Sequence, residues 1–394
     1  MADYVTQVLD SFCSIDAAAW DCLLAQQPAP SPFMRHAYLQ ALESSGSASP
    51  ATGWTPQIIC LKDASGLAAA CVCYLKDHSY GEYVFDWAWA RAYQEHGLNY
   101  YPKAVVAVPF TPVPGSRLMA RDNSARAALA AAVQAWAQQR QLSSVHLLFG
   151  ADEDIDAARR AGWMMRQTVQ FHWSNSTPGY PNFDAFLDAL QQEKRKKIRQ
   201  ERRKVREAGV HFEWRQGSDI SSSDWDFFYR CYERTYLEHG NAPYLSREFF
   251  GAMAEALPAH WLLFIAQRDG RRVACSLIGL NPGASDIARP DGQSVAYGRY
   301  WGALERVDCL HFEACYYQPL EWCISQGYQR FEGGAQGEHK MARALLPVPT
   351  YSAHWLAHPA FADAVNRFLE RETDHLDAYL HHLALRNPLK PTAQ

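Results

Sequence analysis

The sequence lacks the motifs that mark several large protein classes. Its ten cysteines contain no C-x-x-C pair and no H-E-x-x-H motif occurs, so we expect no metal site. There is also no G-x-x-x-x-G-K-[ST] loop and no G-x-G-x-x-G loop, which argues against a nucleotide cradle. Several cysteines fall in apolar runs such as AAACVCYL, so we expect buried, reduced thiols rather than disulfides.

Long hydrophobic runs are missing as well. The longest, near GLAAACVCYL, is about half the length of a membrane span, and the opening residues MADYVTQVLDSF resemble no secretion signal. We therefore expect a soluble cytoplasmic protein. The chain has 394 residues, of which 48% are hydrophobic and 13% aromatic, which indicates an ordered protein of two domains.

The chain is acidic outside one basic segment. The net charge is −4, but residues 193–207, EKRKKIRQERRKVRE, hold nine Lys or Arg against three Glu. This segment is expected to form a basic helical arm that either is simply solvated or tracks the phosphates of a nucleic acid. For the nucleic-acid alternative the candidate residues are Lys194, Arg195, Lys196, Lys197, Arg199, Arg202 and Arg203.

The hydrophobic pattern predicts one plan that occurs twice. Each half reads as a strand hairpin, a central strand, a helix, a strand, a helix and a strand. We expect an α/β (α+β) fold with mixed, mostly antiparallel sheets flanked by helices. The expected boundaries are a first domain at 1–178, the basic helical connector at 179–209 and a second domain at 210–394.

This doubled plan resembles two tandem acyltransferase cores of the GNAT superfamily. The stretches SPFMRHAYLQALE, YGRYWG, EKRKKIRQERRKVREAGV and LHFEACYYQPLEWCISQGYQRFEGGAQGEHKMARALLPVPTYSAHW resemble the FemAB-like group of peptidoglycan biosynthesis or recognition. The resemblance implies acyl transfer to an amine, with acyl-CoA (acetyl-CoA) as co-substrate and no tightly bound cofactor. However, the glycine loop with which GNAT enzymes hold the coenzyme A pyrophosphate has no counterpart in GALERVDCLHFE.

The stretch RFEGGAQGEHKMAR is the strongest candidate for the reaction site. It reads as a strand that ends in Glu332 and opens into glycines, which would bring the backbone close to a ligand. We expect Glu332, Glu338 and His339 to act as acid or base; alternatively, Glu332 pairs with Arg343 or Lys340 and only fixes the loop. The expected substrate-binding residues of this stretch are Gly333, Gly334, Gln336, Lys340 and Arg343.

The preceding helix should present a polar face to the same site. Glu313, Tyr316 and Tyr317 share one helical face, and we expect Tyr317 to be catalytic and the other two to bind substrate, unless the phenols only cap buried carbonyls. His354, from the adjoining strand, is a further substrate-binding candidate. Tyr300, Trp301 and Gly302 are expected to bind the donor.

Three functions remain open on this evidence. The first is an N-acyltransferase that uses an acyl thioester. The second is a Fem-type aminoacyltransferase that uses aminoacyl-tRNA on an acceptor similar to a peptidoglycan precursor, and the third is a recognition module without catalysis. The acceptor is expected to be a small-molecule or peptide-like amine in the first two cases.

Overall fold

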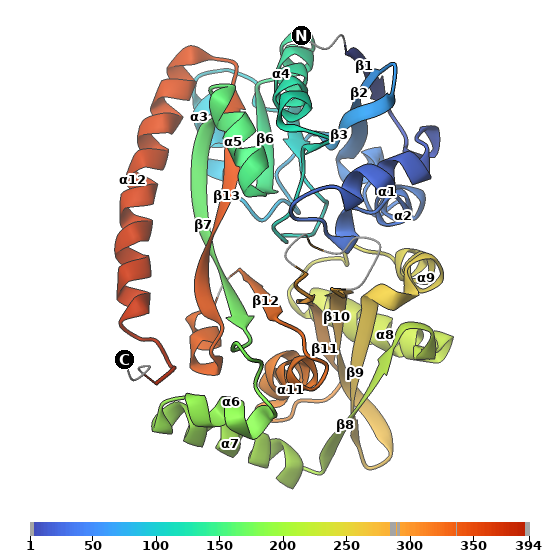
Figure 1. Ribbon diagram of the computed structural model, residues 1–394, viewed down its shortest axis with the longest axis vertical. Helices are drawn as coiled ribbons and strands as arrows, with labels where there is room; N and C mark the ends of the chain where they lie inside the picture. The colour runs from blue at the N-terminus through green and yellow to red at the C-terminus, as the bar shows by residue number, and fades with distance from the viewer. Residues whose placement is uncertain (1–3, 284–288, 290–291, 336, 391–394) are drawn as a thin grey trace. The chain divides into compact units, whose positions relative to one another are not determined.

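The computed structural model describes residues 4–283, 289, 292–335 and 337–390. The chain forms two compact units: unit 1 is Met1–Thr168 with Pro349–Tyr379, and unit 2 is Val169–Val348 with Leu380–Gln394 (Figure 1). This division differs from the boundaries expected at 178 and 209. The expected connector belongs to unit 2, and residues 349–379 belong to unit 1 because the chain returns there near its end.

Unit 1 contains a mixed sheet in the order β1-β2-β3-β4-β6-β13, with β5 paired to β3. Its neighbours are antiparallel except for β4 and β6. The strands are β1 (Val5–Leu9), β2 (Trp54–Asp63), β3 (Gly66–Lys76), β4 (Lys103–Val106), β5 (Met119–Ala120), β6 (Ser144–Gly150) and β13 (Leu346–Leu356). The helices are α1 (Ala17–Ala25), α2 (His36–Ser44), α3 (Trp87–Glu95), α4 (Asn123–Gln139), α5 (Asp152–Arg160) and α12 (Pro359–Ala384).

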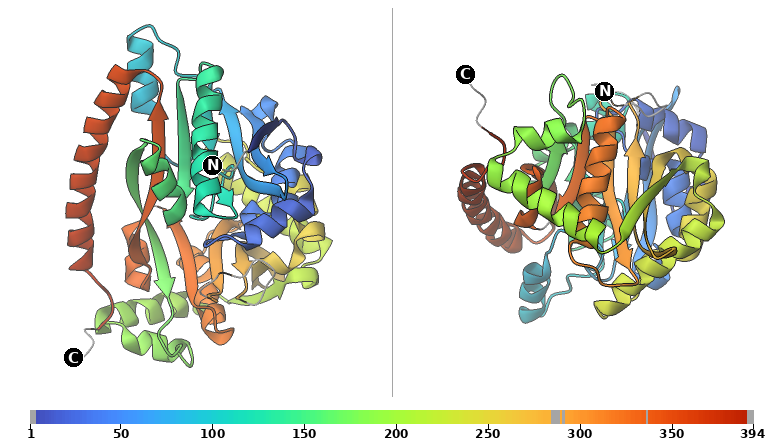
Figure 2. Two further views of the ribbon diagram at one scale, coloured as in Figure 1. Left: turned by 45° about the horizontal axis from the view of Figure 1, so that its top comes forward. Right: turned by 90° about the horizontal axis from the view of Figure 1, so that it is seen from below.

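The core of unit 1 lies between its sheet and helix α4. Leu129 and Val133 of α4 are fully buried against Ile59, Cys71 and Val145 of the strands. The long helix α12 runs beside β13, and its Val365 and Leu369 pack against aromatic residues of α3 and the following loop (Figure 2). Burial of these apolar faces therefore holds α3 and α12 on this unit.

In unit 2 the strands follow the order β7-β12-β11-β10-β9-β8. Only β11 and β12 are parallel. The strands are β7 (Met164–Ser174), of which residues 169–174 belong to this unit, β8 (Val210–Gln216), β9 (Trp261–Arg268), β10 (Arg271–Asn281), β11 (Val295–Ala303) and β12 (Arg330–Ala335). The helices are α6 (Phe183–Ala189), α7 (Gln192–Glu207), α8 (Ser222–Glu238), α9 (Arg247–Ala256), α10 (Leu310–Phe312), the π-helical segment η6 (Glu313–Tyr317), α11 (Gln318–Ser325) and the 3-10 segment η7 (Glu338–Arg343).

Helices cover both faces of the unit 2 sheet. The hydroxyl of Ser276 on β10 donates a hydrogen bond of 2.5 Å to the carbonyl of Ala314, which places the helix of residues 310–325 on one face. Gly302 on β11 lies against the backbone of Cys231 in α8, on the other face. The right-hand view of Figure 2 shows strands between the orange helix and the yellow-green helices.

The doubled plan predicted from the sequence is confirmed. Each unit has a hairpin next to its central strand, and the turn between β9 and β10 has positive φ at both Asp269 and Gly270, as a two-residue hairpin requires. Each unit also has one parallel pair joined by a helix, β4 with β6 and β11 with β12. No helix in the described ranges is long and apolar enough to span a bilayer. All ten cysteines are free thiols; six are buried, whereas Cys13 and Cys22 are exposed.

Candidate functional site

Strands β11 and β12 part from one another partway along their length. Their parallel pairing covers Val295–Tyr297 and residues 330–332, whereas β11 continues to Ala303. A cavity of about 160 Å³ lies where they separate, beneath the helix that starts at Leu310. It is lined by Ser276, Ile278, Gly298, Arg299, Tyr300, Trp301, His311, Cys315, Tyr316, Phe331 and Gly333. We call this the splay cavity.

Four of the residues predicted for the site line the splay cavity. Tyr300 and Trp301 come from β11, Tyr316 from the π-helical segment and Gly333 from β12. His311 and Arg299 also line it but were not predicted as site residues, although His311 lies two residues before the predicted Glu313 and Arg299 directly before Tyr300.

A β-bulge shapes the wall of the cavity. Leu277 pairs with Tyr300 and Ile278 pairs with Gly298, so Arg299 is an extra residue on β11. Such a bulge leaves the extra residue out of the ladder and turns its side chain. A Cβ at Gly298 would lie 3.1 Å from the Phe331 ring, so a small residue is needed where the two strands begin to part.

Glu332 lies on the face of β12 opposite to the cavity. Side chains alternate along a strand, so Phe331 and Gly333 face the cavity and Glu332 faces away, with its cross-strand partners Tyr297 and His172.

The carboxylate of Glu332 is 3% exposed and is bonded by Arg330, not by the expected Arg343 or Lys340. Its Oε2 is 4.0 Å from Nε2 of His172 and has no hydrogen-bond partner among the described residues. Burial lowers the pKa of His172, so this ring is neutral near pH 7.

Tyr316 carries the phenol of the splay cavity. Its OH lies 3.2 Å from Nε2 of His339, and burial raises its pKa well above the ordinary value, so the phenol keeps its proton. Burial also lowers the pKa of His339, an effect that Arg343 and Lys340 strengthen. Burial lowers the pKa of His311 to about 4, so both imidazoles are neutral at pH 7.

The π-helical segment puts Tyr316 in this position. The N–H of Gln318 donates to the carbonyl of Glu313, five residues earlier. In that register the carbonyl of Ala314 would need the N–H of residue 319, but this is Pro319, which has none. The Ser276 hydroxyl supplies the missing bond, so the irregular turn is fixed to β10.

Tyr317, Glu313 and Arg343, predicted as catalytic or substrate-binding residues, do not line the splay cavity and instead bond to residues of α7. The hydroxyl of Tyr317 donates to Glu201 of α7, and Arg343 donates to the same carboxylate at 2.8 Å and to the carbonyl of His339 at 2.6 Å. Glu313 accepts a bond of 3.1 Å from Arg202, also on α7. Because these groups are engaged with α7, they hold the arm against the helix of residues 310–325.

The remaining residues of the predicted site lie in different surroundings. Lys340 donates to the carbonyls of Gly333 and Gly334 at 2.6 and 3.2 Å, so it supports the glycine turn. Glu338 is exposed and pairs with Arg386 at 2.6 Å. Gln336 lies outside the described residues. A Cβ at Gly302, which was predicted to bind the donor, would come within 2.0 Å of a backbone oxygen in α8, so this glycine allows α8 to pack closely on β11.

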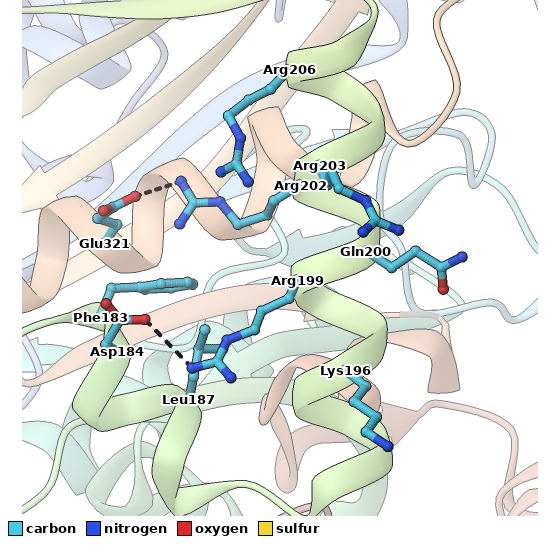
Figure 3. A pocket seen from close by; sticks show the side chains of 10 residues that line it. All are labelled: Phe183, Asp184, Leu187, Lys196, Arg199, Gln200, Arg202, Arg203, Arg206 and Glu321. Carbon is cyan, nitrogen blue, oxygen red and sulfur yellow. Dashed lines mark hydrogen bonds and ion pairs between the residues drawn. The ribbon is translucent and has the colours of Figure 1, made fainter.

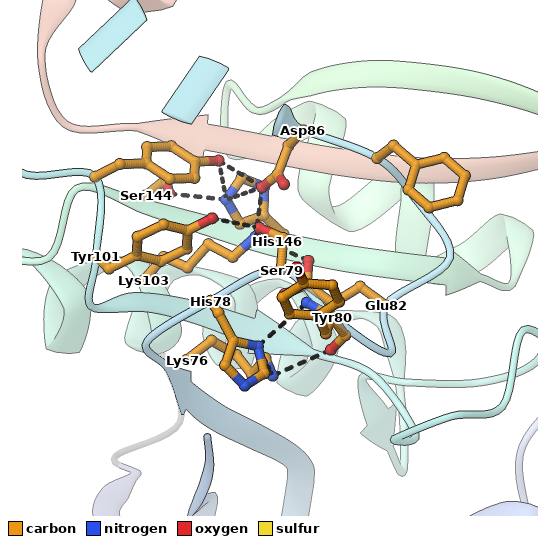
Figure 4. A network of polar contacts seen from close by, with 12 residues as sticks. Lys76, His78, Ser79, Tyr80, Glu82, Asp86, Tyr101, Lys103, Ser144 and His146 are labelled. Carbon is orange, nitrogen blue, oxygen red and sulfur yellow. Dashed lines mark hydrogen bonds and ion pairs between the residues drawn. The ribbon is translucent and has the colours of Figure 1, made fainter. Parts of the chain in front are cut away.

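His354 belongs to unit 1, whereas the other residues predicted for the site belong to unit 2. It is 1% exposed, and its Nδ1 lies 2.7 Å from Nδ1 of His146. Figure 4 shows His146 beside Asp86, Lys103 and Ser144 in a buried polar network. Lys103 is fully buried and lies 2.8 Å from Glu82 and close to Asp86.

The basic arm forms a charged groove with α6. A cavity of about 640 Å³ lies between them (Figure 3), and it is lined by Phe183, Asp184, Leu187, Lys196, Arg199, Gln200, Arg202, Arg203, Arg206 and Glu321. Of the seven cations predicted for nucleic acid, four form ion pairs: Arg195, Arg199, Arg202 and Arg203. No ion pair within the described ranges involves Lys194, Lys196 or Lys197. We call this the arm groove.

No group of His, Cys, Asp and Glu in the described part of the chain is arranged to hold a metal ion.

Comparison with known proteins gives a family and a fold. The model of the FemAB-like family, described as peptidoglycan biosynthesis/recognition, matches residues 11–391. No curated protein matches the sequence at a significant level.

Among solved structures, FemX is similar with a TM-score of 0.55 and 9% identity, covering 91% of this chain and 100% of that one. L-PGS from Bacillus licheniformis has a TM-score of 0.52 and 12% identity, covering 90% of this chain and 97% of that one. The C-terminal domain of a putative lysylphosphatidylglycerol synthetase from Agrobacterium fabrum has a TM-score of 0.50 and 10% identity, covering 88% of this chain and 95% of that one. These likenesses confirm the predicted fold.

Proposed function

The chain belongs to the FemAB-like family, and on that premise we propose that unit 2 is an N-acyltransferase whose donor places its acyl group in the splay cavity. One observation carries this proposal. The strands β11 and β12 separate at a point that has a protonated phenol, Tyr316, on one face and a buried carboxylate, Glu332, on the other. Amine acylation needs an acid and a base on either side of the reacting carbonyl.

In the proposed reaction, the neutral amine nitrogen attacks the carbonyl carbon of an acyl thioester. The new C–N bond forms as the C–S bond breaks, and the amine loses one proton while the thiolate gains one. Glu332 accepts the proton of the amine, with His172 beside it, and Tyr316 donates a proton to the leaving sulfur. His339, 3.2 Å from the Tyr316 hydroxyl, can return a proton to that phenol.

The size of the splay cavity bears on the acyl group of the donor. The volume of about 160 Å³ favours a short acyl group, such as acetyl, over a long chain.

A transfer assay tests this proposal. Purified protein is mixed with acetyl-CoA and a panel of amines, and released thiol is measured. Tyr316→Phe should lower the turnover number by about 10²-fold or more, because the leaving group loses its acid. The matched control is Tyr180→Phe, a partly buried phenol that packs on Phe186. Full activity of Tyr316→Phe with a working donor would place the chemistry elsewhere.

A second donor, aminoacyl-tRNA, is favoured by one observation, the arm groove. Lys196, Arg199, Arg203 and Arg206 of α7 line this groove (Figure 3). Lys194, Lys196 and Lys197 of the arm form no ion pair among the described residues. Phosphate contacts by such cations make binding strongly salt-dependent.

Filter binding of charged tRNA at several salt concentrations tests this alternative. Replacing Lys194, Lys196 and Lys197 by Gln should reduce the magnitude of the slope of log affinity against log salt by about 2, because each lost phosphate contact contributes about 0.7. Absence of tRNA binding at low salt would remove this donor. Stabilisation by a donor without transfer to any amine would instead support the recognition module.

A further inference from the structure

An apolar groove lies between helices α3 and α12 of unit 1. Its volume is about 600 Å³, much larger than that of the splay cavity. Nine of the eleven residues that line it are apolar, and the other two are His96 and His358. A volume of this size is typical of a site for a small organic ligand. We call it the α3–α12 groove.

The two helices run in opposite directions along this groove. Tyr93, near the end of α3, contacts Phe361, near the start of α12, with ring centroids 4.1 Å apart. Trp89, earlier on α3, belongs to the same buried cluster as Val365, later on α12. Figure 1 shows α3 beside the first turns of α12. The groove therefore leads from the end of α3 back towards its start.

Small side chains keep the groove open. Ala88 and Ala92 are four residues apart on α3, and Ala360 and Ala364 have the same spacing on α12, so each pair lies on one face of its helix. Larger side chains at these positions would fill the space between the helices. Phe368, which also lines the groove, is 37% exposed. Apolar surface is thus open to a ligand along both helices.

The two histidines lie at one end of the groove. Both imidazoles meet the ring of Phe361 edge-on, with centroids 5.4 Å away for His96 and 5.2 Å away for His358. Nδ1 of His96 donates to the carbonyl of Ala92 at 2.8 Å, because a carbonyl can only accept. Nε2 of His96 and both ring nitrogens of His358 have no hydrogen bond to a residue in the described ranges. The groove is therefore apolar along its length and polar at one end.

A carboxyl group matches this polar end. A neutral acid can donate its proton to the lone pair of an imidazole nitrogen, and a carboxylate can accept a hydrogen bond from an imidazolium. No Asp, Glu, Lys or Arg in the described part of the chain lines the groove, so no other charged group competes for the imidazoles there. Hydrogen bonds between charged partners are about twice as strong as neutral ones. A carboxyl end is therefore favoured over a hydroxyl end.

The length of the groove limits what it can hold. Helix α3 has nine residues, which span about 14 Å. A stable protein interface buries about 800 Å² on each partner, far more than so short a groove offers. A single hydrocarbon chain, by contrast, can lie between the two helices along this length.

We propose that unit 1 binds a long-chain carboxylic acid, with its hydrocarbon chain in the α3–α12 groove and its carboxyl end at His96 and His358. All residues that line the groove belong to unit 1. The proposal is thus independent of the acyl transfer proposed for unit 2.

Isothermal titration of the full chain tests the proposal. The ligands are octanoic, decanoic and dodecanoic acid and the alcohols of the same lengths, all below the concentration at which they aggregate and without an acyl donor. Each added methylene should tighten binding about two- to fourfold, because more apolar surface leaves water. The acid should bind about tenfold more tightly than the alcohol of equal length. Absence of binding, or an affinity that does not rise with chain length, would overturn the proposal.

A variant that fills the groove tests the position of the chain. Ala364 is exposed, so Ala364→Phe occupies the groove without disturbing the core. It should weaken the binding of dodecanoic acid about tenfold or more, because the chain loses apolar contact. Ala127→Phe is the matched control, since this alanine is exposed on α4 and does not line the groove. Thermal unfolding checks that both variants are folded, and wild-type affinity in Ala364→Phe would contradict the assignment.

A double variant, His96→Leu with His358→Leu, tests the polar end. It should bind acid and alcohol about equally well, with the affinity for the alcohol nearly unchanged. His375→Leu is the control, because this histidine is exposed on α12 outside the groove. A wild type without preference for the acid, or a preference that survives in the double variant, would refute the placement of the carboxyl end.

Sedimentation velocity examines the other occupant, a second copy of this chain. A dimer that Ala364→Phe removes, together with the absence of binding of any acid, would assign the groove to self-association and overturn the proposal. Binding of the acids with unchanged sedimentation would support it. Failure of acyl transfer in unit 2 leaves these results unaffected, because no measurement uses a donor.

Discussion

Glu332 and His172 lie directly opposite each other on the antiparallel strands β12 and β7, with 4.0 Å between Oε2 and Nε2. Arg330 bonds the other oxygen of the carboxylate. One oxygen is thus anchored while Oε2 has no hydrogen-bond partner in the described part of the chain. A buried carboxylate with one oxygen available is suited to accept a proton from an amine.

Replacing Glu332 by Gln should therefore lower the turnover number by about 10²- to 10⁴-fold and leave donor affinity nearly unchanged, because the amide keeps the shape and removes the base. Initial rates with saturating donor measure this effect. Glu255→Gln, an exposed carboxylate on α9, is the control. Equal turnover in Glu332→Gln and the control would remove Glu332 from the chemistry.

The pair of Arg343 and Glu201 should be important for stability rather than turnover. Both side chains are buried, with 2% and 9% exposed, and they are 2.8 Å apart. Removing one partner of a buried pair leaves an unpaired charge, which costs about 3–5 kcal/mol. Glu201→Gln and Arg343→Met should each lower the free energy of unfolding by that amount, and the double variant by less than the sum. Additive losses in denaturant unfolding would show that the two residues act independently.

Much of the fold could be predicted from sequence because the hairpins and helices follow local patterns. Asp269-Gly270 is a turn signal, and the apolar periods of the strands and of residues 183–190 are plain. The sequence could not predict with which unit the last strand of each half pairs. β7 pairs with β12 of unit 2, and β13 pairs with β6 of unit 1, and only long-range pairing decides this.

The candidate site was predictable in position but not in roles. Tyr316 and Tyr317 are neighbours on a polar face, yet the π-helical turn points one to the splay cavity and the other to Glu201. The roles predicted for Tyr316 and Tyr317 assumed a regular helix. His354 was predicted beside residues of the second half, but the chain returns to unit 1 at residue 349.

The two lysines opposite each other in unit 1 predict a pH dependence of stability. Lys76 and Lys103 are a cross-strand pair, and both are fully buried. Glu82 and Asp86 outweigh the effect of burial on Lys103 and raise its pKa. Burial lowers the pKa of Lys76 from 10.5 to about 7.

Between pH 7 and 10.5 the unfolded chain thus binds more protons at Lys76 than the folded chain, so this residue makes stability rise with pH. Each unit of pKa difference corresponds to about 1.4 kcal/mol. Urea unfolding at pH 6.5, 8 and 9.5 should show a steeper rise for the wild type than for Lys76→Met. Parallel profiles would contradict the lowered pKa.

Gly302 should not tolerate a larger residue. A Cβ there would meet a backbone oxygen of Cys231 at 2.0 Å, so α8 would have to move away from β11. Gly302→Ala should lower the free energy of unfolding by about 1–3 kcal/mol. Gly251→Ala on α9, where the nearest atom is 3.5 Å away, should instead raise it by about 1 kcal/mol, since alanine favours a helix. A Gly302→Ala protein as stable as the wild type would show that α8 is not packed this closely.

Hydrogen exchange of the Glu332→Gln protein tests the central claim most directly, because the donor can bind without being consumed. Acetyl-CoA or charged tRNA is added, and exchange is followed by mass spectrometry. The donor that the enzyme uses should slow exchange in residues 297–303 and 310–316, the segments that contribute most of the lining of the splay cavity. A donor that binds but slows exchange only in other segments, such as those of unit 1, would contradict it.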